Sequence, residues 1–234
     1  MKPSRHFDII VGLFVCVLLL SNLLSSAKII DVGVSIGAFQ LIFDAGTLVF
    51  PISYIFGDIL TEVYGYRRSR RVIWIGFLGT ALMALFVWVA GVLPGESAWQ
   101  QYAGQPAYDA ILGSVTGLAA ASLTAYFAGE FSNSYVLAKM KIRTRGRWLP
   151  LRTIGSTIVG QGVDTIVFFM VAGAIGVFPW ELIPSLVFTN YLLKVGIEMA
   201  FTPLTIPAIQ ALKQSEGVDI FDTETDFNPF NFRA

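Results

Sequence analysis

The residues of this chain that could do chemistry are ionisable and amide side chains that stand inside long apolar stretches. Asn190, Lys194 and Glu198 recur every four residues and so share one stripe of a helix, on which Lys194 can pair with Glu198. Gln161 and Asp164 stand three residues apart near the middle of the preceding stretch. An ionised side chain at the centre of a bilayer costs at least about 2.5 kcal/mol, so these residues indicate a binding site or an ion pathway.

Earlier stretches add further polar side chains to this set. Asp58 and Glu62 are four residues apart, and the first stretch contributes Asn22. Glu62 is the weakest member, because it lies close to a run of arginines that it could simply neutralise, and Glu130 is discounted for the same reason. Asp44 is expected at the external surface. The alternative for the whole set is structural: these groups would satisfy one another through hydrogen bonds and salt bridges between helices.

The chemistry of these side chains favours binding over catalysis. Carboxylates beside amides suit a neutral ligand with adjacent N–H donors, and the aromatic residues, 14% of the chain, offer flat stacking surfaces. A nucleobase-like molecule, a coupling proton and a cation would each fit. His6 is the only histidine and Cys16 the only cysteine, so a Ser-His hydrolase or a zinc site lacks its side chains, and a phosphate-binding loop is also missing. We therefore expect no enzyme activity, no cofactor and no metal.

The elements that must position these residues are transmembrane helices. The chain has 234 residues, of which 55% are hydrophobic and 14% charged, far more apolar than a water-soluble domain. A bilayer core of about 30 Å needs about 20 apolar residues of helix, which predicts six spans and an all-α fold, a polytopic bundle. The predicted spans are Phe7 to Lys28, Gln40 to Tyr64, Val72 to Leu93, Tyr108 to Leu137, Leu151 to Phe178 and Leu182 to Leu212.

The positions of the basic residues predict the orientation, because short cytoplasmic loops collect Lys and Arg. Fourteen of the 16 basic residues fall before the first span, after the second and fourth spans, and after the sixth. The opposite connections, which contain Asp31, Glu96 and Glu181, hold none. Both termini are therefore expected in the cytoplasm.

Further patterns concern packing and domain division. Small residues recur every four positions from Gly113 to Gly129, a face that lets another helix approach closely. Pro51 interrupts the second predicted span and is expected to kink it. We divide the chain into a six-helix transmembrane domain, residues 1–212, and an acidic tail, residues 213–234, which is expected to be a mostly disordered cytoplasmic end.

Four segments carry a family resemblance. They are Ser21–Lys28, Phe50–Gly65, Gly155–Thr165 and Asn190–Glu198. The most specific piece is the proline of the second segment followed by Gly-Asp-x-x-x-Glu-x-Tyr-Gly. These segments resemble the queuosine precursor transporter family, also called the vitamin uptake transporter family, and the likeness covers nearly the whole chain.

The resemblance implies a six-helix carrier of the bacterial inner membrane that imports 7-deazaguanine precursors of the tRNA base queuosine, such as 7-cyano- or 7-aminomethyl-7-deazaguanine. Such a base presents N1–H and an exocyclic NH₂ side by side, and one carboxylate can accept both. By position in the matching segments, eight residues inherit the role of substrate site: Asn22, Asp58, Glu62, Gln161, Asp164, Asn190, Lys194 and Glu198. The sequence leaves open which carboxylate contacts the base, which precursor is preferred and which ion drives transport.

Two alternatives stand beside this hypothesis. In helix number the family also resembles the substrate-binding subunits of energy-coupling-factor vitamin transporters, which work with ATPase partners, and the small-residue face could dock such a partner. The other alternative is a non-transporting membrane scaffold whose buried charges are merely paired. The expected partners are a small-molecule substrate and membrane lipid, without nucleic acid, and the sequence leaves a homo-oligomer open.

Overall fold

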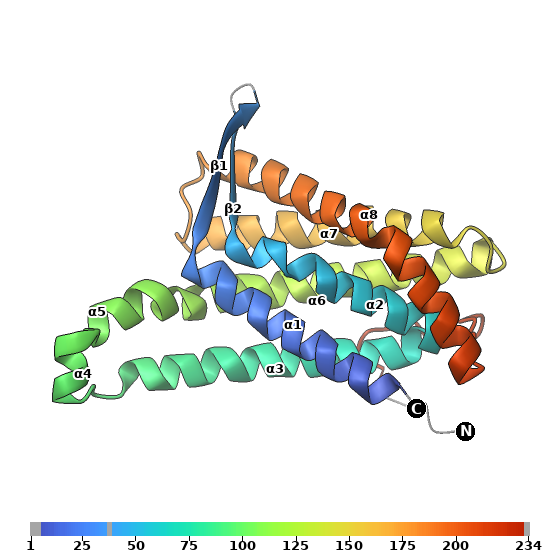
Figure 1. Cartoon of the computed structure of the whole chain (residues 1–234), viewed down its shortest axis with the longest axis horizontal. Helices are drawn as coiled ribbons and strands as arrows, with labels where there is room; N and C mark the ends of the chain where they lie inside the picture. The colour runs from blue at the N-terminus through green and yellow to red at the C-terminus, as the bar shows by residue number, and fades with distance from the viewer. Residues whose placement is uncertain (1–5, 37–38, 232–234) are drawn as a thin grey trace.

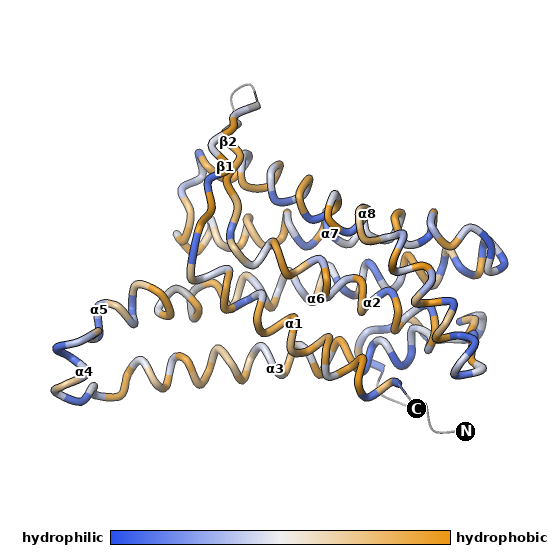
Figure 2. Tube along the Cα trace, viewed as in Figure 1, coloured by the Kyte–Doolittle hydropathy of each residue, from blue (hydrophilic) through white to orange (hydrophobic). Residues whose placement is uncertain are grey.

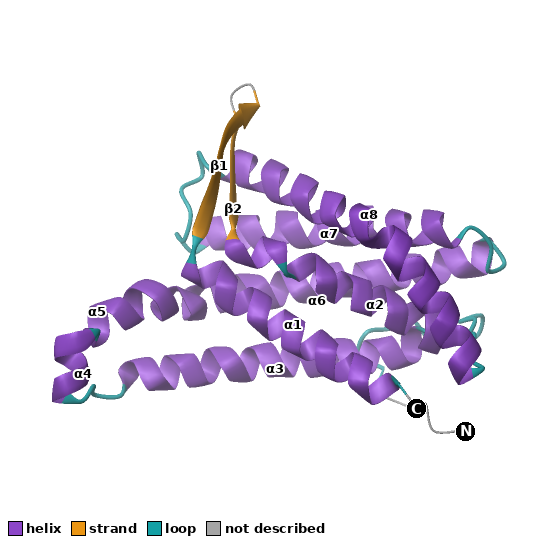
Figure 3. Ribbon diagram, in the orientation of Figure 1, coloured by secondary structure: helices purple, strands orange, loops and turns teal. Residues whose placement is uncertain are grey.

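Long apolar helices form the body of the molecule (Figures 1 and 3). The computed structural model describes residues 6–36 and 39–231. Five helices in these ranges are long and apolar enough to cross a membrane, the third of them counted together with the turns that precede it. They are α1 (Phe7–Ala27), α3 (Tyr66–Val92), α6 (Ser114–Arg143), α7 (Leu149–Ala174) and α8 (Ile183–Glu216). Five of the predicted spans are thus confirmed as helices of a multi-pass membrane protein.

The second predicted span, Gln40 to Tyr64, is wrong in its first half. Its residues up to Asp44 belong to a strand, a short 3-10 helix, η1 (Ala45–Leu48), follows, and α2 covers only Phe50–Tyr64. Pro51 lies in the first turn of α2 and begins the helix instead of kinking a longer one, because its missing N–H needs no partner there. With 15 residues, α2 is about 22 Å long and shorter than a bilayer core.

The described structure is mostly helical, as expected for the all-α class, but it also contains a β-hairpin between α1 and η1 that was not predicted. Strand β1 (Ile29–Ile36) pairs antiparallel with β2 (Phe39–Asp44), and Ile29 lies opposite Asp44. Most residues of β1 are isoleucine or valine, whose branched side chains favour strands. The hairpin projects across the direction of the helices (Figure 1), and β2 contacts α8.

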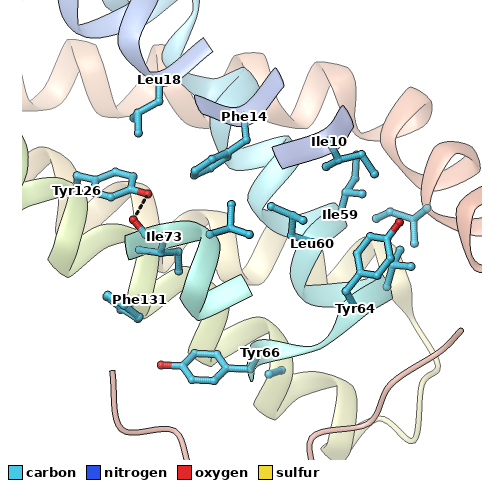
Figure 4. Packing of buried hydrophobic residues seen from close by; sticks show 14 residues of the cluster. Ile10, Phe14, Leu18, Ile59, Leu60, Tyr64, Tyr66, Ile73, Tyr126 and Phe131 are labelled. Atoms are coloured by element: carbon cyan, nitrogen blue, oxygen red, sulfur yellow. Dashed lines mark hydrogen bonds between the residues drawn. The ribbon is translucent and has the colours of Figure 1, made fainter. Parts of the chain in front are cut away.

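Helix α2 lies inside the bundle, in contact with α1, α3, α6 and α8, and most of its residues are buried. Figure 4 shows the apolar core on one side of it, where Phe14 of α1, Leu60 of α2 and Ile73 of α3 come together. The hydroxyl of Tyr126 on α6 donates to the carbonyl of Ile73 at 2.9 Å, so the one polar atom of that ring is satisfied within the core.

Helices α6 and α7 approach each other very closely. A Cβ atom built on Gly129 of α6 would lie 2.6 Å from the Cβ of Asp164 on α7. A Cβ built on Gly160 of α7 would lie 2.6 Å from the Cβ of Asn133 on α6. The predicted small-residue face is therefore used within the molecule, at least at its Gly129 end.

The surface follows the pattern of a protein in lipid. Hydrophobic residues run along the lengths of the helices, and hydrophilic residues gather at the connections (Figure 2). The connection after α3 contains two short helices, α4 (Ser97–Tyr102) and α5 (Gly104–Tyr108), and a π-helical turn (Asp109–Gly113) that leads into α6. Helix α8 contains Pro203 and Pro207 and bends along its second half (Figure 1), as expected for prolines inside a helix.

The described part of the acidic tail, residues 217–231, lies against α3. The carboxylate of Asp222 accepts from the backbone N–H of Tyr66, at 3.0 and 3.2 Å for its two oxygens. The guanidinium of Arg70 donates to two tail carbonyls at 2.8 Å, and Trp74 donates to the carbonyl of Pro229 at 2.9 Å. These contacts differ from the expected disorder, and they arise because the free N–H groups at the start of α3 attract a carboxylate. The division into residues 1–212 and 213–234 stays a prediction.

Candidate functional site

A cavity lies among α1, η1, α2, α3, α6, α7 and α8, and its free volume is about 40 Å³. Its lining combines hydrogen-bonding side chains with aromatic rings. The polar residues are Ser21, Asn22, Ser25, Asp44, Thr47, Thr80, Ser122, Asp164 and Lys194, and the rings belong to Phe50, Phe168 and Phe169. Three of the eight predicted site residues, Asn22, Asp164 and Lys194, therefore share one cavity.

The charged centre of the cavity is an ion pair between two helices. The Nζ atom of Lys194 on α8 lies 2.9 Å from Oδ2 of Asp164 on α7, and both residues are buried. The same ammonium lies 4.3 Å from the centre of the Phe50 ring. Lys194 thus pairs with Asp164 and not, as the sequence suggested, with Glu198 one turn along its own helix. The close contact of α7 with α8 puts Asp164 within reach of the ammonium.

Asp44 organises the wall of the cavity next to the hairpin. Its carboxylate accepts from Ser25 at 2.5 Å and caps η1 by accepting from the N–H of Thr47 at 3.2 Å and from its hydroxyl at 2.9 Å. The Thr47 hydroxyl also lies 2.6 Å from Oδ1 of Asn190 on α8. Asp44 was expected at the external surface. The signal that could have found its role is Asp44-Ala-Gly-Thr47, a carboxylate three residues before the N–H that it caps.

Asn22 joins α1 to α6 at the same cavity. Its amide N–H donates to the carbonyl of Leu18 at 2.9 Å, and its carbonyl accepts a hydrogen bond from the hydroxyl of Ser122 on α6. Ser122 was missed by the sequence reasoning, since an isolated serine in an apolar helix carries no distinctive signal. The pair links the two helices that contribute to the cavity lining.

Three other predicted residues form a second buried group, one turn along α8 from the ion pair. Glu198 accepts from the hydroxyl of Thr157 and, at 3.2 Å, from the amide of Gln161, both on α7. Asp58 of α2 accepts from the amide of Asn133 on α6 at 2.8 Å. These two carboxylates accept hydrogen bonds from neutral donors, and within the described residues neither forms an ion pair, so this part of the bundle is acidic.

Glu130 of α6 belongs with this acidic group, although the sequence discounted it as a neutraliser of cytoplasmic arginines. Its side chain is fully buried, and neither carboxylate oxygen has a hydrogen-bond partner within residues 6–36 and 39–231. A Cβ atom built on Gly57 of α2 would lie 3.0 Å from Oε2 of Glu130, so the glycine makes room for the carboxyl group. The earlier placement failed because sequence position fixes depth along a helix but not the face on which a side chain lies.

Glu62 lies in a third group, at the end of the bundle where the basic residues gather. Its Oε1 atom lies 2.6 Å from Lys213 of α8, 2.7 Å from Arg152 of α7 and 3.6 Å from Lys141 of α6. Asp219 of the tail completes the cluster at 2.7 Å from Lys141 and 2.8 Å from Lys213. Partial burial tends to raise the pKa of Asp219, but the hydrogen bonds and charges of the two lysines outweigh it and hold the pKa below its usual value.

The eight predicted residues thus fall into three groups along the bundle, which we call levels: the cavity, the acidic group and the charged end. They do not all line one cavity. Asn22, Asp164 and Lys194 line the cavity, and Asn190 supports it through Thr47. Asp58, Gln161 and Glu198 lie in the acidic group, and Glu62 lies among cations. Chemically, the first level can bind a polar aromatic ligand, the second can hold protons, and the third crosslinks helices.

Comparison with known proteins gives concordant matches. A family model described as "putative vitamin uptake transporter" matches residues 44–208, a range that contains every predicted site residue except Asn22. A protein of Bacillus subtilis (strain 168) named "probable queuosine precursor transporter" is 30% identical over 179 residues, which is 76% of each chain. A protein of Haemophilus influenzae with the same name is 28% identical over 154 residues, 65% of this chain and 62% of its own length. No solved structure matches the chain.

Proposed function

Because the chain belongs to the vitamin uptake transporter family, and is therefore a multi-pass membrane transporter and not an enzyme, we propose that it imports a 7-deazaguanine precursor of queuosine. The substrates in question are 7-cyano-7-deazaguanine and 7-aminomethyl-7-deazaguanine. The names of the two relatives support a queuosine precursor as the substrate class. The chemistry of the cavity supports the choice of a flat base with adjacent N–H donors.

The observation that carries this proposal is the Lys194–Asp164 pair beside Phe50 in the cavity. The carboxylate of Asp164 is the acceptor that we assign to N1–H and the exocyclic NH₂ of the base, since one carboxylate matches two parallel donors. Lys194 donates a hydrogen bond to that carboxylate, and the ring of Phe50 offers a stacking face. In this assignment Asn22 supplies an amide contact from the lining, and Asn190 holds Thr47 in place.

The volume of the cavity supports a mechanism in which the helices move. A space of about 40 Å³ holds a few water molecules but not a bicyclic base. The arrangement described here is therefore a closed state in which the pair of Lys194 and Asp164 occupies the place of the ligand. Substrate entry requires the walls formed by α1, η1 and α6 to separate from α7 and α8, as in alternating access.

We also propose six crossings with both termini in the cytoplasm of a bacterial cell, where α2 together with η1 serves as the second crossing. Its small contact with lipid, as a helix enclosed by four others, supports a span of only 15 residues. His6 and Glu216 lie 3.1 Å apart, so α1 begins and α8 ends on the same side, which an even number of crossings requires. Lys2, Arg5 and Arg233, used in the orientation argument, lie outside the described residues.

Uptake of radiolabelled 7-cyano-7-deazaguanine into cells that cannot synthesise it tests the proposal. Expression of the wild-type protein is expected to give substrate-dependent accumulation, and Asp164→Asn to weaken binding about 10- to 100-fold, the equivalent of one hydrogen bond to a charged group. Asp8→Asn, at an exposed position in the first turn of α1, is the matched control and should leave uptake unchanged. Absence of accumulation by the wild-type protein would refute the proposal.

Proteoliposomes containing this chain alone separate the proposal from an ATPase-dependent transporter subunit. Uptake there is expected, because Ala121, Ala125 and Gly129 of the small-residue face are buried inside the bundle and are not available to a partner. Loss of uptake on purification would favour the ATPase-dependent subunit. A purified protein whose melting temperature no deazaguanine changes would favour the scaffold.

A further inference from the structure

Glu130 is a buried carboxyl group for which the proposed substrate site has no use. It is fully buried at the centre of the bundle, and both of its oxygens lack a hydrogen-bond partner in the described part of the chain. Buried carboxylates elsewhere in this molecule are bonded: Asp164 by Lys194, Glu198 by Thr157 and Gln161, and Asp58 by Asn133. Glu130 is therefore exceptional in a molecule that otherwise satisfies such groups.

The ionisable groups around Glu130 are all acidic. Those that interact with it electrostatically are Asp58 and Tyr54 of α2, Asp164 of α7 and Glu198 of α8, together with Tyr126 on its own helix. Among the described residues no cation appears in this set, and the hydrogen bond that joins α1 to α6 runs from the hydroxyl of Ser122 to the amide oxygen of Asn22, which are both uncharged. An ionised Glu130 would face this acidic environment without a hydrogen-bond donor, which favours the neutral, protonated form of the side chain.

The position of Glu130 also connects it to the proposed substrate site. The preceding residue, Gly129, packs so closely on α7 that an added Cβ would lie 3.2 Å from the Cα of Asp164. On the other side, the carboxyl group lies against Gly57, next to Asp58. A movement of α6 away from α7 that opens the cavity around Asp164 would therefore also change the surroundings of Glu130.

We propose that Glu130 is the proton-binding residue through which this transporter couples substrate import to a proton gradient. In the closed state the proton is bound to a carboxylate oxygen of Glu130. When the helices part toward the cytoplasm and water reaches the group, the O–H bond breaks, the proton passes to water and the carboxylate is hydrated. One proton is carried inward with each substrate, and the inference rests on the proposed function for what that substrate is.

Transport by reconstituted protein tests the coupling. Proteoliposomes with an acidic exterior are expected to accumulate labelled 7-cyano-7-deazaguanine, and Glu130→Gln is expected to reduce this accumulation to the equilibrium level while exchange of internal for external substrate stays within about threefold of wild type. Glu181→Gln, at an exposed position between α7 and α8, is the matched control and should accumulate like wild type. Glu130→Asp, which keeps an ionisable group, should retain driven accumulation.

Accumulation by Glu130→Gln under a pH gradient would overturn the proposal, and so would wild-type accumulation driven only by a sodium gradient. Infrared difference spectra over a pH titration provide a test that needs no substrate. The wild-type protein should show the carbonyl stretch of a protonated carboxylic acid at neutral pH, and Glu130→Gln should lose that band. If wild-type protein neither exchanges nor accumulates the compound, the proposed function fails. Absence of the carbonyl band from the wild-type spectrum would separately overturn the assignment of a proton to Glu130.

Discussion

Two buried glutamates, Glu62 on α2 and Glu130 on α6, have the same chemistry and the same lack of solvent exposure but opposite surroundings. Glu62 contacts Arg152, Lys213 and Lys141 from three different helices through one oxygen. Glu130 has no hydrogen-bond partner among the described residues. The difference teaches that burial alone does not assign a role to a carboxyl group. Cations make Glu62 a crosslink between helices, whereas their absence makes Glu130 a group that can gain and lose a proton.

The same contrast extends to the regions around the two residues. The level of Glu62 is tied by ion pairs that join α2, α6, α7, α8 and the tail. The level of Glu130 is held by close packing of glycines and by hydrogen bonds from neutral donors. We infer that the helices pivot about the charged end, while the centre and the cavity change shape.

The strongest test of this comparison is Glu62→Gln. Removing the carboxylate leaves buried cations with reduced compensation, and loss of one partner from a buried ion pair typically costs about 3–5 kcal/mol. We expect a loss of free energy of unfolding in that range, measured by denaturant titration in mixed micelles. A loss below about 1 kcal/mol would show that the cations do not depend on Glu62.

Gly129→Ala tests how tightly the centre is packed. The new methyl group would meet the Tyr54 hydroxyl at 2.5 Å and the Asp164 side chain at 2.6 Å, and overpacking of this kind costs about 1–3 kcal/mol. Gly12→Ala on α1 is the control, because no atom lies within 4 Å of its Cβ. Equal unfolding free energies of the two variants would contradict the close contact between α6 and α7.

Asp219→Asn probes the outer edge of the charged level. The side chain is 46% exposed, so we expect a loss of only about 0.5 kcal/mol at pH 7. Because the pKa of Asp219 is lower in the folded protein, its contribution is present above the unfolded pKa of about 3.9 and disappears as the pH falls through the folded pKa. Melting temperatures of wild type and variant should therefore differ at pH 7 and converge as the pH falls below the folded pKa of Asp219. A difference in melting temperature between wild type and variant that increases as the pH falls would contradict the lowered pKa of Asp219.

The smallest effect is expected for Glu130→Gln on stability. A neutral amide of nearly the same shape replaces a neutral acid, so the unfolding free energy should change by no more than about 0.5 kcal/mol. The same denaturant titration used for Glu62→Gln provides the measurement. A change as large as that of Glu62→Gln would mean that Glu130 is ionised and paired, and the contrast between the two glutamates would be lost.

Hydropathy was sufficient to predict the long helices, because lipid requires about 20 apolar residues per crossing whatever the partners are. It failed at residues 40–48, where a strand and a short 3-10 helix precede α2 and Pro51 begins the helix. The periodic stripe of Asn190, Lys194 and Glu198 correctly predicted three buried residues on one helix.

The partners of those residues could not be predicted in the same way. Local spacing suggested a pair within α8, whereas the ion pair of Lys194 with Asp164 depends on how α7 packs against α8. Glu130 was undervalued for a similar reason, since its isolation is a property of α2, α7 and α8 around it and not of its neighbours in sequence. Asp44 showed its role only through side chains from α1 and η1 that the fold brings to it.

The docking of the tail on α3 has a practical consequence for work on this protein. Phe227 packs on Tyr66 and Phe230 on Trp74, so the last described residues are part of the folded structure close to the chain end. An affinity tag or a fluorescent protein fused directly after Ala234 would compete for the surface on which these rings lie. The exposed connection that contains α4, at the opposite end of α3, is a better place for an epitope, and a long flexible spacer is advisable for any C-terminal fusion.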